Sequence, residues 1–156
     1  MLLIGCASGD IQNSTGELDR DGRFIAYNNG TVLDTKTNLM WAARDNGKMI
    51  SWQEAKSYCA NYHGGGYKDW RMPTQDELLG LYDASKGYYP DCVQLGGGHV
   101  HLTMLIHLSC DVVFASETRE TVYSTEYAFV YFSTGRGGWV SPKRAILWVL
   151  PVRSVK

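Results

Sequence analysis

Short runs of alternating apolar and polar residues begin at position 23 and are typical of β-strands. Asn29 and Gly30 separate two of these runs, and this dipeptide favours the tight turn of a β-hairpin. The polar segment 34–37 predicts a second turn, which precedes an apolar run that includes Trp41. The first part of the chain is therefore predicted to form a hairpin and one further strand.

Two later segments carry apolar residues at intervals of three to four, the spacing of one helix face. The first helix is predicted to begin at Ser51, because Glu54 three positions later completes a capping box. Three consecutive glycines predict its end. The second helix is predicted to begin at Thr74, with Glu77 in the equivalent capping position, and Gly87 predicts its end.

The segment 88–109 has no clear period, and it contains several glycines and three histidines. We expect a long irregular loop with one short helix near 102–108. Strand-like runs return after position 110, with a turn at 135–138. The last run, 145–153, is almost continuously apolar, as in a central buried strand. This order predicts an α+β fold, with two helices between the N-terminal hairpin and a C-terminal antiparallel sheet.

Length and charge limit the possible classes of protein. The chain has 156 residues, which suits one domain able to bury its own hydrophobic core. Its formal net charge is -1, and its 15 basic residues are scattered along the sequence. A nucleic acid partner is therefore not expected.

Residues 3–6, Leu-Ile-Gly-Cys, resemble the bacterial lipobox, in which a signal peptidase cuts before a cysteine that then receives lipid. This resemblance implies that Cys6 is lipidated; the alternative is an apolar tail with a buried Cys6. The polar residues that follow predict a flexible tether. We therefore expect a lipobox-like N-terminus and tether over 1–22 and a single domain over 23–156. No other run approaches the roughly 20 apolar residues of a transmembrane helix.

Cys92 and Cys110 flank the glycine-rich loop and are candidates for a disulfide in an oxidising compartment. Cys59 lies on a face of the first predicted helix and is expected to be a buried thiol. No C-x-x-C pair is present, so a thiolate zinc site is not expected. Cys110 and His107 could form a nucleophilic pair, but no residue that would orient the histidine can be identified.

His99 and His101 are two positions apart, so on an extended segment their imidazoles point to the same side. They could share a metal ion with His107 or Asp91. The alternative, which we prefer, is a polar loop without a metal, in which both histidines are candidates for ligand binding.

Glu117 and Glu126 are acids flanked by serine or threonine on adjacent predicted strands, where they could act as acid and base. We expect instead that they bond to backbone groups or pair with arginines, for which Arg71, Arg119 and Arg153 are candidates.

Four aromatic residues of the last third could form a stacking surface for sugar rings or peptide, or they could pack across strands. They are Tyr123, Tyr127, Tyr131 and Trp139.

The segment 69–74, Asp-Trp-Arg-Met-Pro-Thr, is predicted to be a structural joint between the two helices. Pro73 restricts the preceding residue to extended geometry, and Trp70 can pack under the junction. Asp69 and Arg71 would share one face, where they could pair with each other or with backbone groups.

These segments together resemble the Lcl C-terminal domain family, a bacterial envelope and adhesin-associated family, from about Arg23 to Arg153. The resemblance rests on NNGTVLDTKTNLMWAA, SWQEAKSYCANYHGGGYKDWRMPTQDELLGLYD, FASET and VLPVR. The central block also resembles segments of formylglycine-generating enzymes. That likeness implies a C-type lectin-like fold, with two helices, a twisted antiparallel sheet and long irregular loops. The signature residues are Trp41, Trp52, Asp69, Trp70, Arg71, Pro73, Thr74 and Glu77.

The resemblance implies a lipoprotein or secreted module of the bacterial cell envelope that binds a glycan or protein ligand, without catalysis, cofactor or metal. The sequence lacks the motifs by which calcium-dependent lectins hold sugars. It also lacks the late cysteine pair of formylglycine-generating enzymes and a terminal partner for Cys59. The alternatives are an enzyme related to that group and a structural envelope or pilus module. The candidate ligand-binding residues are His99, His101, Glu117, Tyr123, Tyr127 and Trp139.

Overall fold

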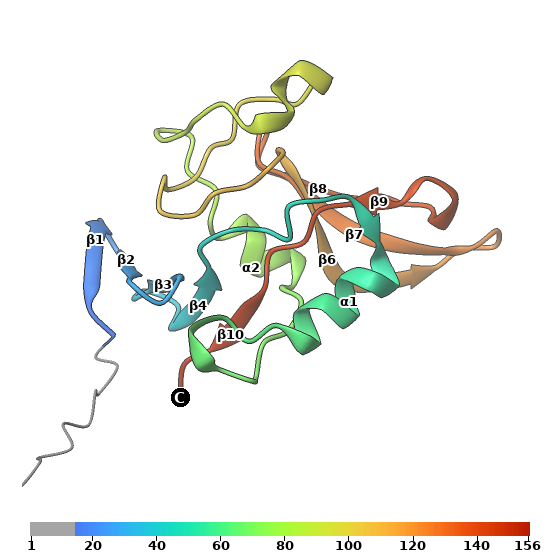
Figure 1. Cartoon of the computed structure of the whole chain (residues 1–156). Coiled ribbons are helices and arrows are strands. Elements are labelled where there is room, and N and C mark those ends of the chain that lie inside the picture. The colour runs from blue at the N-terminus through green and yellow to red at the C-terminus, as the bar shows by residue number, and fades with distance from the viewer. Residues whose placement is uncertain (1–14) are drawn as a thin grey trace, which may run out of the picture.

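The computed structural model describes residues 15–156 of the chain (Figure 1). Within this range the protein is an α+β domain with two α-helices and three antiparallel sheets, as the order of elements predicted. The sheets have the strand orders β1-β2-β3-β4-β10, β5-β9 and β6-β7-β8. The strands are β1 (Glu17–Asp21), β2 (Phe24–Tyr27), β3 (Thr31–Asp34), β4 (Leu39–Ala42), β5 (Ile50–Ser51), β6 (Val112–Glu120), β7 (Thr125–Tyr131), β8 (Arg136–Val140), β9 (Ile146–Leu147) and β10 (Val152–Ser154).

The five-stranded sheet contains the predicted hairpin. Asn29 and Gly30 lie in the turn between β2 and β3, and Gly30 adopts a φ of 79° that favours glycine. A second turn leads to β4, as predicted. The segment 17–21, which we expected to belong to a flexible tether, forms β1 and pairs with β2. That expectation is wrong for these residues. Their polar composition suggested a tether, but backbone hydrogen bonds to β2 hold them in an exposed strand.

The C-terminal run does not form one central strand. β9 pairs with β5, whereas β10 lies at the edge of the five-stranded sheet beside β4. Pro151 lies between β9 and β10 and has no backbone N–H for a sheet ladder, which explains the break. The turn expected at 135–138 ends earlier, because β8 begins at Arg136.

The two helices begin where the sequence predicts. α1 (Trp52–Asn61) has Ser51 as its N-cap, and α2 (Gln75–Leu79) has Thr74, each with a complete capping box. α2 ends at Leu79, so the end predicted at Gly87 is wrong. After α2 the chain bonds to another segment instead, since the Asp83 N–H donates to the His101 carbonyl over 3.0 Å.

The segment 82–110 forms the loop at the top of Figure 1. The helix expected near 102–108 is absent there, because its backbone groups bond to other segments. The His107 N–H donates to the Ala43 carbonyl over 2.8 Å, and the Leu108 N–H donates to the Tyr88 hydroxyl over 2.7 Å. A short 3₁₀ helix, η2 (Asp91–Leu95), occurs earlier in the loop. The other 3₁₀ helices are η1 (Gly64–Gly66) and η3 (Pro142–Arg144).

A disulfide joins Cys92 to Cys110 and closes this loop, which confirms the predicted pair. Cys59 is a free cysteine on the buried face of α1, also as predicted, and burial raises the pKa of its thiol to about 12.

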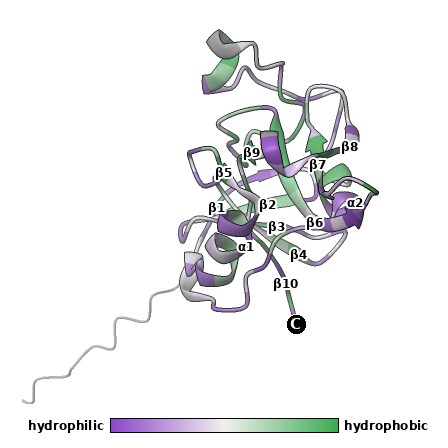
Figure 2. Ribbon diagram, turned by 90° about the vertical axis from the view of Figure 1, so that its right-hand side faces the viewer, coloured by the Kyte–Doolittle hydropathy of each residue, from purple (hydrophilic) through white to green (hydrophobic). Residues whose placement is uncertain are grey.

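The buried hydrophobic residues come from both the strands and the connecting segments, and α1 is mostly hydrophilic (Figure 2). The main core includes Trp41, Leu78 and Phe132. A second cluster beneath α1 includes Cys59 and Met72. This second cluster supports both α1 and the extended segment that leads into α2.

Candidate functional site

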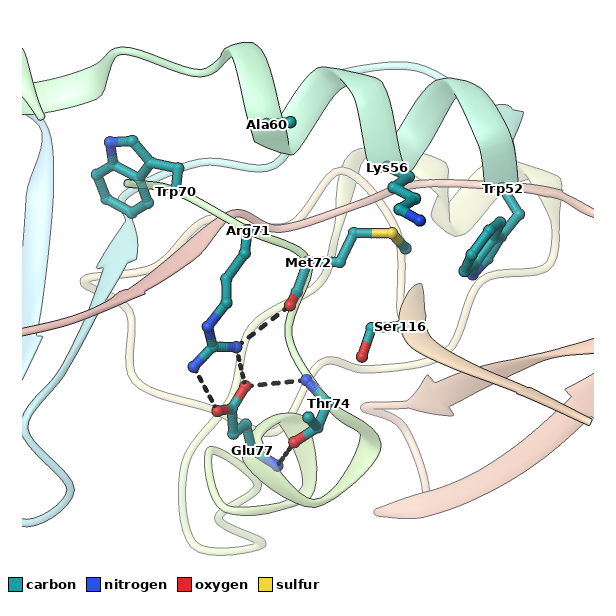
Figure 3. Close-up of a pocket in the computed structure, with 9 residues that line it drawn as sticks. All are labelled: Trp52, Lys56, Ala60, Trp70, Arg71, Met72, Thr74, Glu77 and Ser116. Atoms are coloured by element: carbon teal, nitrogen blue, oxygen red, sulfur yellow. Dashed lines mark hydrogen bonds and ion pairs between the residues drawn. The ribbon is translucent and has the colours of Figure 1, made fainter. Parts of the chain in front are cut away.

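A pocket of about 560 Å³ opens between α1 and the extended segment before α2 (Figure 3). One wall comes from α1, another from the DWRMPT segment, and the end of the buried part of β6 completes it. Its lining residues are Trp52, Lys56, Ala60, Trp70, Arg71, Met72, Thr74, Glu77 and Ser116.

The α1 wall follows from helix geometry. Trp52, Lys56 and Ala60 are spaced four residues apart and therefore lie on one face. Ala55 and Cys59 are fully buried, which fixes the rotation of the helix against the core. The capping box fixes where the helix begins, so the three lining residues are presented together.

Trp52 is held on two sides. Its ring stacks on Tyr127, with centroids 4.8 Å apart and planes inclined by 7°. Its indole Nε1 donates to the Ala115 carbonyl over 2.9 Å, and Gln53 Nε2 donates to the Tyr127 hydroxyl over 2.6 Å. Trp52 is therefore a fixed aromatic wall. Tyr127, which we expected to contact ligand, is buried behind it and supports it instead.

Arg71 and Glu77 form the charged side of the pocket. Arg71 Nη1 donates to Glu77 Oε2 over 2.9 Å, and Nη2 donates to Oε1 over 2.7 Å, a bidentate pair. The Thr74 backbone N–H also donates to Glu77 over 2.9 Å. Burial acts to raise the pKa of Glu77, but the hydrogen bonds from Arg71 and Thr74 outweigh it and lower the pKa. The pair is therefore ionised and carries no net charge at neutral pH.

Asp69 and Arg71 do not pair with each other. Asp69 accepts two hydrogen bonds from Arg153, over 2.6 Å from Nε and 3.1 Å from Nη2. These bonds lower the pKa of the Asp69 carboxyl. The Arg153 guanidinium also lies 3.8 Å from the centroid of the Tyr67 ring.

The DWRMPT segment is a structural joint, as predicted, and it also lines the pocket. Trp70 is buried and donates from Nε1 to the Gly64 carbonyl over 3.1 Å. The Arg71 and Val152 backbones exchange hydrogen bonds of 2.9 and 3.0 Å, and the Ser116 N–H donates to the Pro73 carbonyl over 2.9 Å. The joint thus connects β10, β6 and both helices.

Two polar groups of the pocket form no hydrogen bond or ion pair among residues 15–156. Lys56 Nζ lies 5.7 Å from the centroid of the Trp52 ring, and no described side chain or carbonyl forms a hydrogen bond or ion pair with it. The Ser116 hydroxyl likewise has no hydrogen bond within the described range. Figure 3 shows both groups bordering the same hollow beside Met72.

Three of the four histidines, His99, His101 and His107, lie in the 82–110 loop, outside this pocket. The rings of His99 and His101 are 4.7 Å apart, consistent with the shared side that the sequence predicts. His107 pairs with Asp91 instead, Nε2 to Oδ2 at 3.3 Å. Across residues 15–156, the only group of three potential metal ligands is Cys92, Cys110 and Asp111, and its two cysteines form the disulfide.

The predicted acidic candidates have structural partners. Glu117 accepts from the Gln75 N–H over 2.9 and 3.0 Å, at the start of α2. Glu126 pairs with Arg119 at 2.7 Å, and the Arg119 guanidinium lies 4.7 Å from the Trp139 ring centroid. These contacts agree with the structural reading of both acids that we preferred.

The remaining candidate, Tyr123, lies between β6 and β7 with 94% of its surface exposed. The six residues predicted to bind ligand therefore do not lie together at one site. The pocket is lined by other residues. Lys56, Met72 and Ser116 lie within segments that carry the family resemblance, but sequence reasoning did not assign them to a pocket, because no local pattern shows that α1, the DWRMPT segment and β6 meet. The four-residue spacing of Trp52, Lys56 and Ala60, on the helix face next to the buried Ala55 and Cys59, was the available signal.

The fold and the site define an α+β domain with a preformed, aromatic-walled pocket. The chain belongs to the Lcl C-terminal domain family, whose model matches residues 30–153. This match confirms the resemblance seen in the sequence. No curated protein and no solved structure is similar enough to the chain to count as a match.

Among residues 15–156, no helix has the length and apolar character needed to cross a membrane. Cys6, the predicted lipidation site, lies outside the described residues.

Proposed function

We propose that this domain is a non-enzymatic ligand-binding or adhesion module that holds its ligand in the pocket between α1 and the DWRMPT segment. The observation that carries the proposal is the fixed Trp52 wall beside two polar groups, Lys56 Nζ and the Ser116 hydroxyl, that form no hydrogen bond or ion pair among residues 15–156. A concave site with apolar walls and a few oriented polar groups is typical of small-ligand binding. The ligand is a glycan or a protein segment small enough to enter it.

The contacts of the potential catalytic groups support binding over catalysis. Cys110 is in a disulfide, so it has no thiolate to offer as a nucleophile. Cys59 is buried with a thiol pKa of about 12, and Glu117 is engaged at the start of α2. These contacts disfavour the alternative of an enzyme related to the formylglycine-generating group.

We also infer a C-type lectin-like fold and a location in the bacterial envelope or outside the cell, with Cys6 as a lipid anchor. The two helices, antiparallel sheets and long 82–110 loop support the fold. The Cys92–Cys110 disulfide supports an oxidising compartment. The lipobox-like residues support the anchor. Neither nucleic acid, metal nor cofactor is part of this proposal.

A glycan and peptide array, probed with the 156-residue protein with and without calcium, tests the proposal. The decisive variant is Ala60→Phe, which places a large ring in the pocket from an exposed helix position. We expect it to weaken binding of any array ligand by about tenfold, because the ring occupies space that the ligand needs.

Ser57→Phe is the matched control, since it adds the same ring to an exposed position of α1 outside the pocket lining. Both variants should unfold at similar urea concentrations. If no array ligand binds with or without calcium, the result would favour the alternative of a structural envelope or pilus module. Equal binding by Ala60→Phe and the parent protein would place the ligand elsewhere.

A further inference from the structure

We propose, resting on the function above, that the pocket takes a small organic monoanion: a carboxylate group carried on an apolar body. The proposal comes from the charges, apolar surfaces and free hydroxyl that border the hollow. Each of these constrains a different part of the ligand.

The charge of the lining favours one negative charge on the ligand. Arg71 and Glu77 neutralise each other through their bidentate pair. Lys56 is the remaining charged residue of the lining, and no ion pair to it occurs within residues 15–156. The lining therefore carries a net charge of about one positive unit at neutral pH. An ammonium group beside an apolar surface is complementary to a carboxylate.

The walls next to Lys56 favour an apolar body. Met72 is 95% buried and contributes to the floor beneath the helix, and Trp52 presents its fixed ring beside it. The methylene stem of Lys56 can lie along such a surface while the ammonium group reaches the anion. A ligand that is charged at one end and apolar next to that charge would contact all three residues.

The hydroxyl groups of Ser116 and Thr74 favour a hydrogen-bonding group on the side of the ligand that faces β6 and the start of α2. Thr74 Oγ1 accepts from the Glu77 N–H over 3.2 Å, which leaves its proton available as a donor. Ser116 can donate and accept. A carboxylate oxygen or an adjacent amide would satisfy these groups.

Two kinds of ligand carry a carboxylate on an apolar body. One is a free carboxylic acid, and the other is the C-terminus of a peptide that ends in an apolar residue. Matched probes distinguish them. The free-acid arm uses 4-methylpentanoate and its neutral amide. The peptide arm uses N-acetyl-Gly-Gly-Leu with a free carboxylate and the same peptide with an amide terminus. Calorimetry gives each Kd, and the indole N–H resonances of the protein report whether Trp52 is affected.

We expect each carboxylate to bind about twofold to fivefold more tightly than its amide, the range for an exposed ion pair. The preference should fall as salt is raised from low to physiological ionic strength. Lys56→Gln should abolish the preference, because carboxylate binding should weaken more than amide binding. Lys36→Gln, at an exposed lysine in the β3–β4 turn, should retain it. The tighter of the two carboxylates identifies the source.

Equal binding of acid and amide by the parent protein, or a preference that survives Lys56→Gln, would overturn the inference. Either result would leave the proposed binding function standing, because a ligand would still occupy the pocket. Absence of binding by all four probes would also overturn it. The proposed function would then be judged separately by the array and by the Ala60→Phe variant.

Discussion

Arg71 and Glu77 join the start of α2 to one side of the pocket. Glu77 accepts from the Thr74 N–H within the capping box and from both terminal nitrogens of Arg71. The same carboxylate therefore stabilises a helix end and neutralises a cation that faces the ligand site. Removal of the Glu77 carboxylate should therefore lower the folding stability of the domain.

Glu77→Gln is expected to lower the free energy of unfolding by about 1 kcal/mol at pH 7. Glutamine can still occupy the capping position, but it cannot pair with the partly exposed Arg71. The folded-state pKa of Glu77 is lowered, so its contribution is present above the unfolded pKa and is lost as the pH falls through the folded pKa. Urea unfolding at several pH values measures this.

The stability difference between parent and Glu77→Gln should thus shrink below about pH 4. Glu17→Gln is the control, because Glu17 pairs with Arg20 on the exposed strand β1 and should change stability little. A difference that stays constant down to pH 2 would contradict an electrostatic origin.

At the scale of elements, the features with local causes were predictable from sequence. The capping residues Ser51 and Thr74 and the Asn29-Gly30 turn act on adjacent backbone, so their spacing is enough to place them. The end of α2 and the segment 102–108 depend on hydrogen bonds to distant segments. Periodicity carries no information about those bonds, and both predictions were wrong.

The candidate site shows the same division. The joint at 69–74 was predictable because proline and a helix cap act locally. Arg153, the partner of Asp69, is 84 residues away along the chain. Ser116 reaches the pocket from β6, which is also distant in sequence. The pocket itself therefore required the tertiary structure, although the α1 face that lines it follows from sequence.

The 82–110 loop depends on its disulfide. Cys92 and Cys110 are separated by 18 residues, and a bridge closing a loop of this size contributes about 3 kcal/mol in the chain-entropy account. We expect the double variant Cys92→Ser/Cys110→Ser to lose stability of this order in urea unfolding. Reductant should destabilise the parent to a similar extent and leave the double variant unchanged. Equal stability of parent and double variant would show that loop packing alone holds the segment.

At the scale of the whole molecule, the C-terminal strand β10 packs beside the N-terminal strands and the DWRMPT joint. β10 pairs with β4 and bonds to the joint through Arg71 and Val152. Arg153 extends this closure, since it binds Asp69 and covers the Tyr67 ring. One wall of the pocket is therefore held by the last residues of the sequence.

Arg153→Met tests whether this closure also organises the pocket. Methionine keeps much of the buried stem, but loss of the cation from the Tyr67 ring should alone cost about 1 kcal/mol of folding stability. The freed Asp69 can turn to water, so the joint should loosen rather than unfold. We therefore expect a lower urea midpoint and weaker binding of the array ligand. Arg20→Met, in the exposed β1 pair, should change neither. Weakened stability with full ligand affinity would show that Met72 and α1 hold the pocket without the terminal closure.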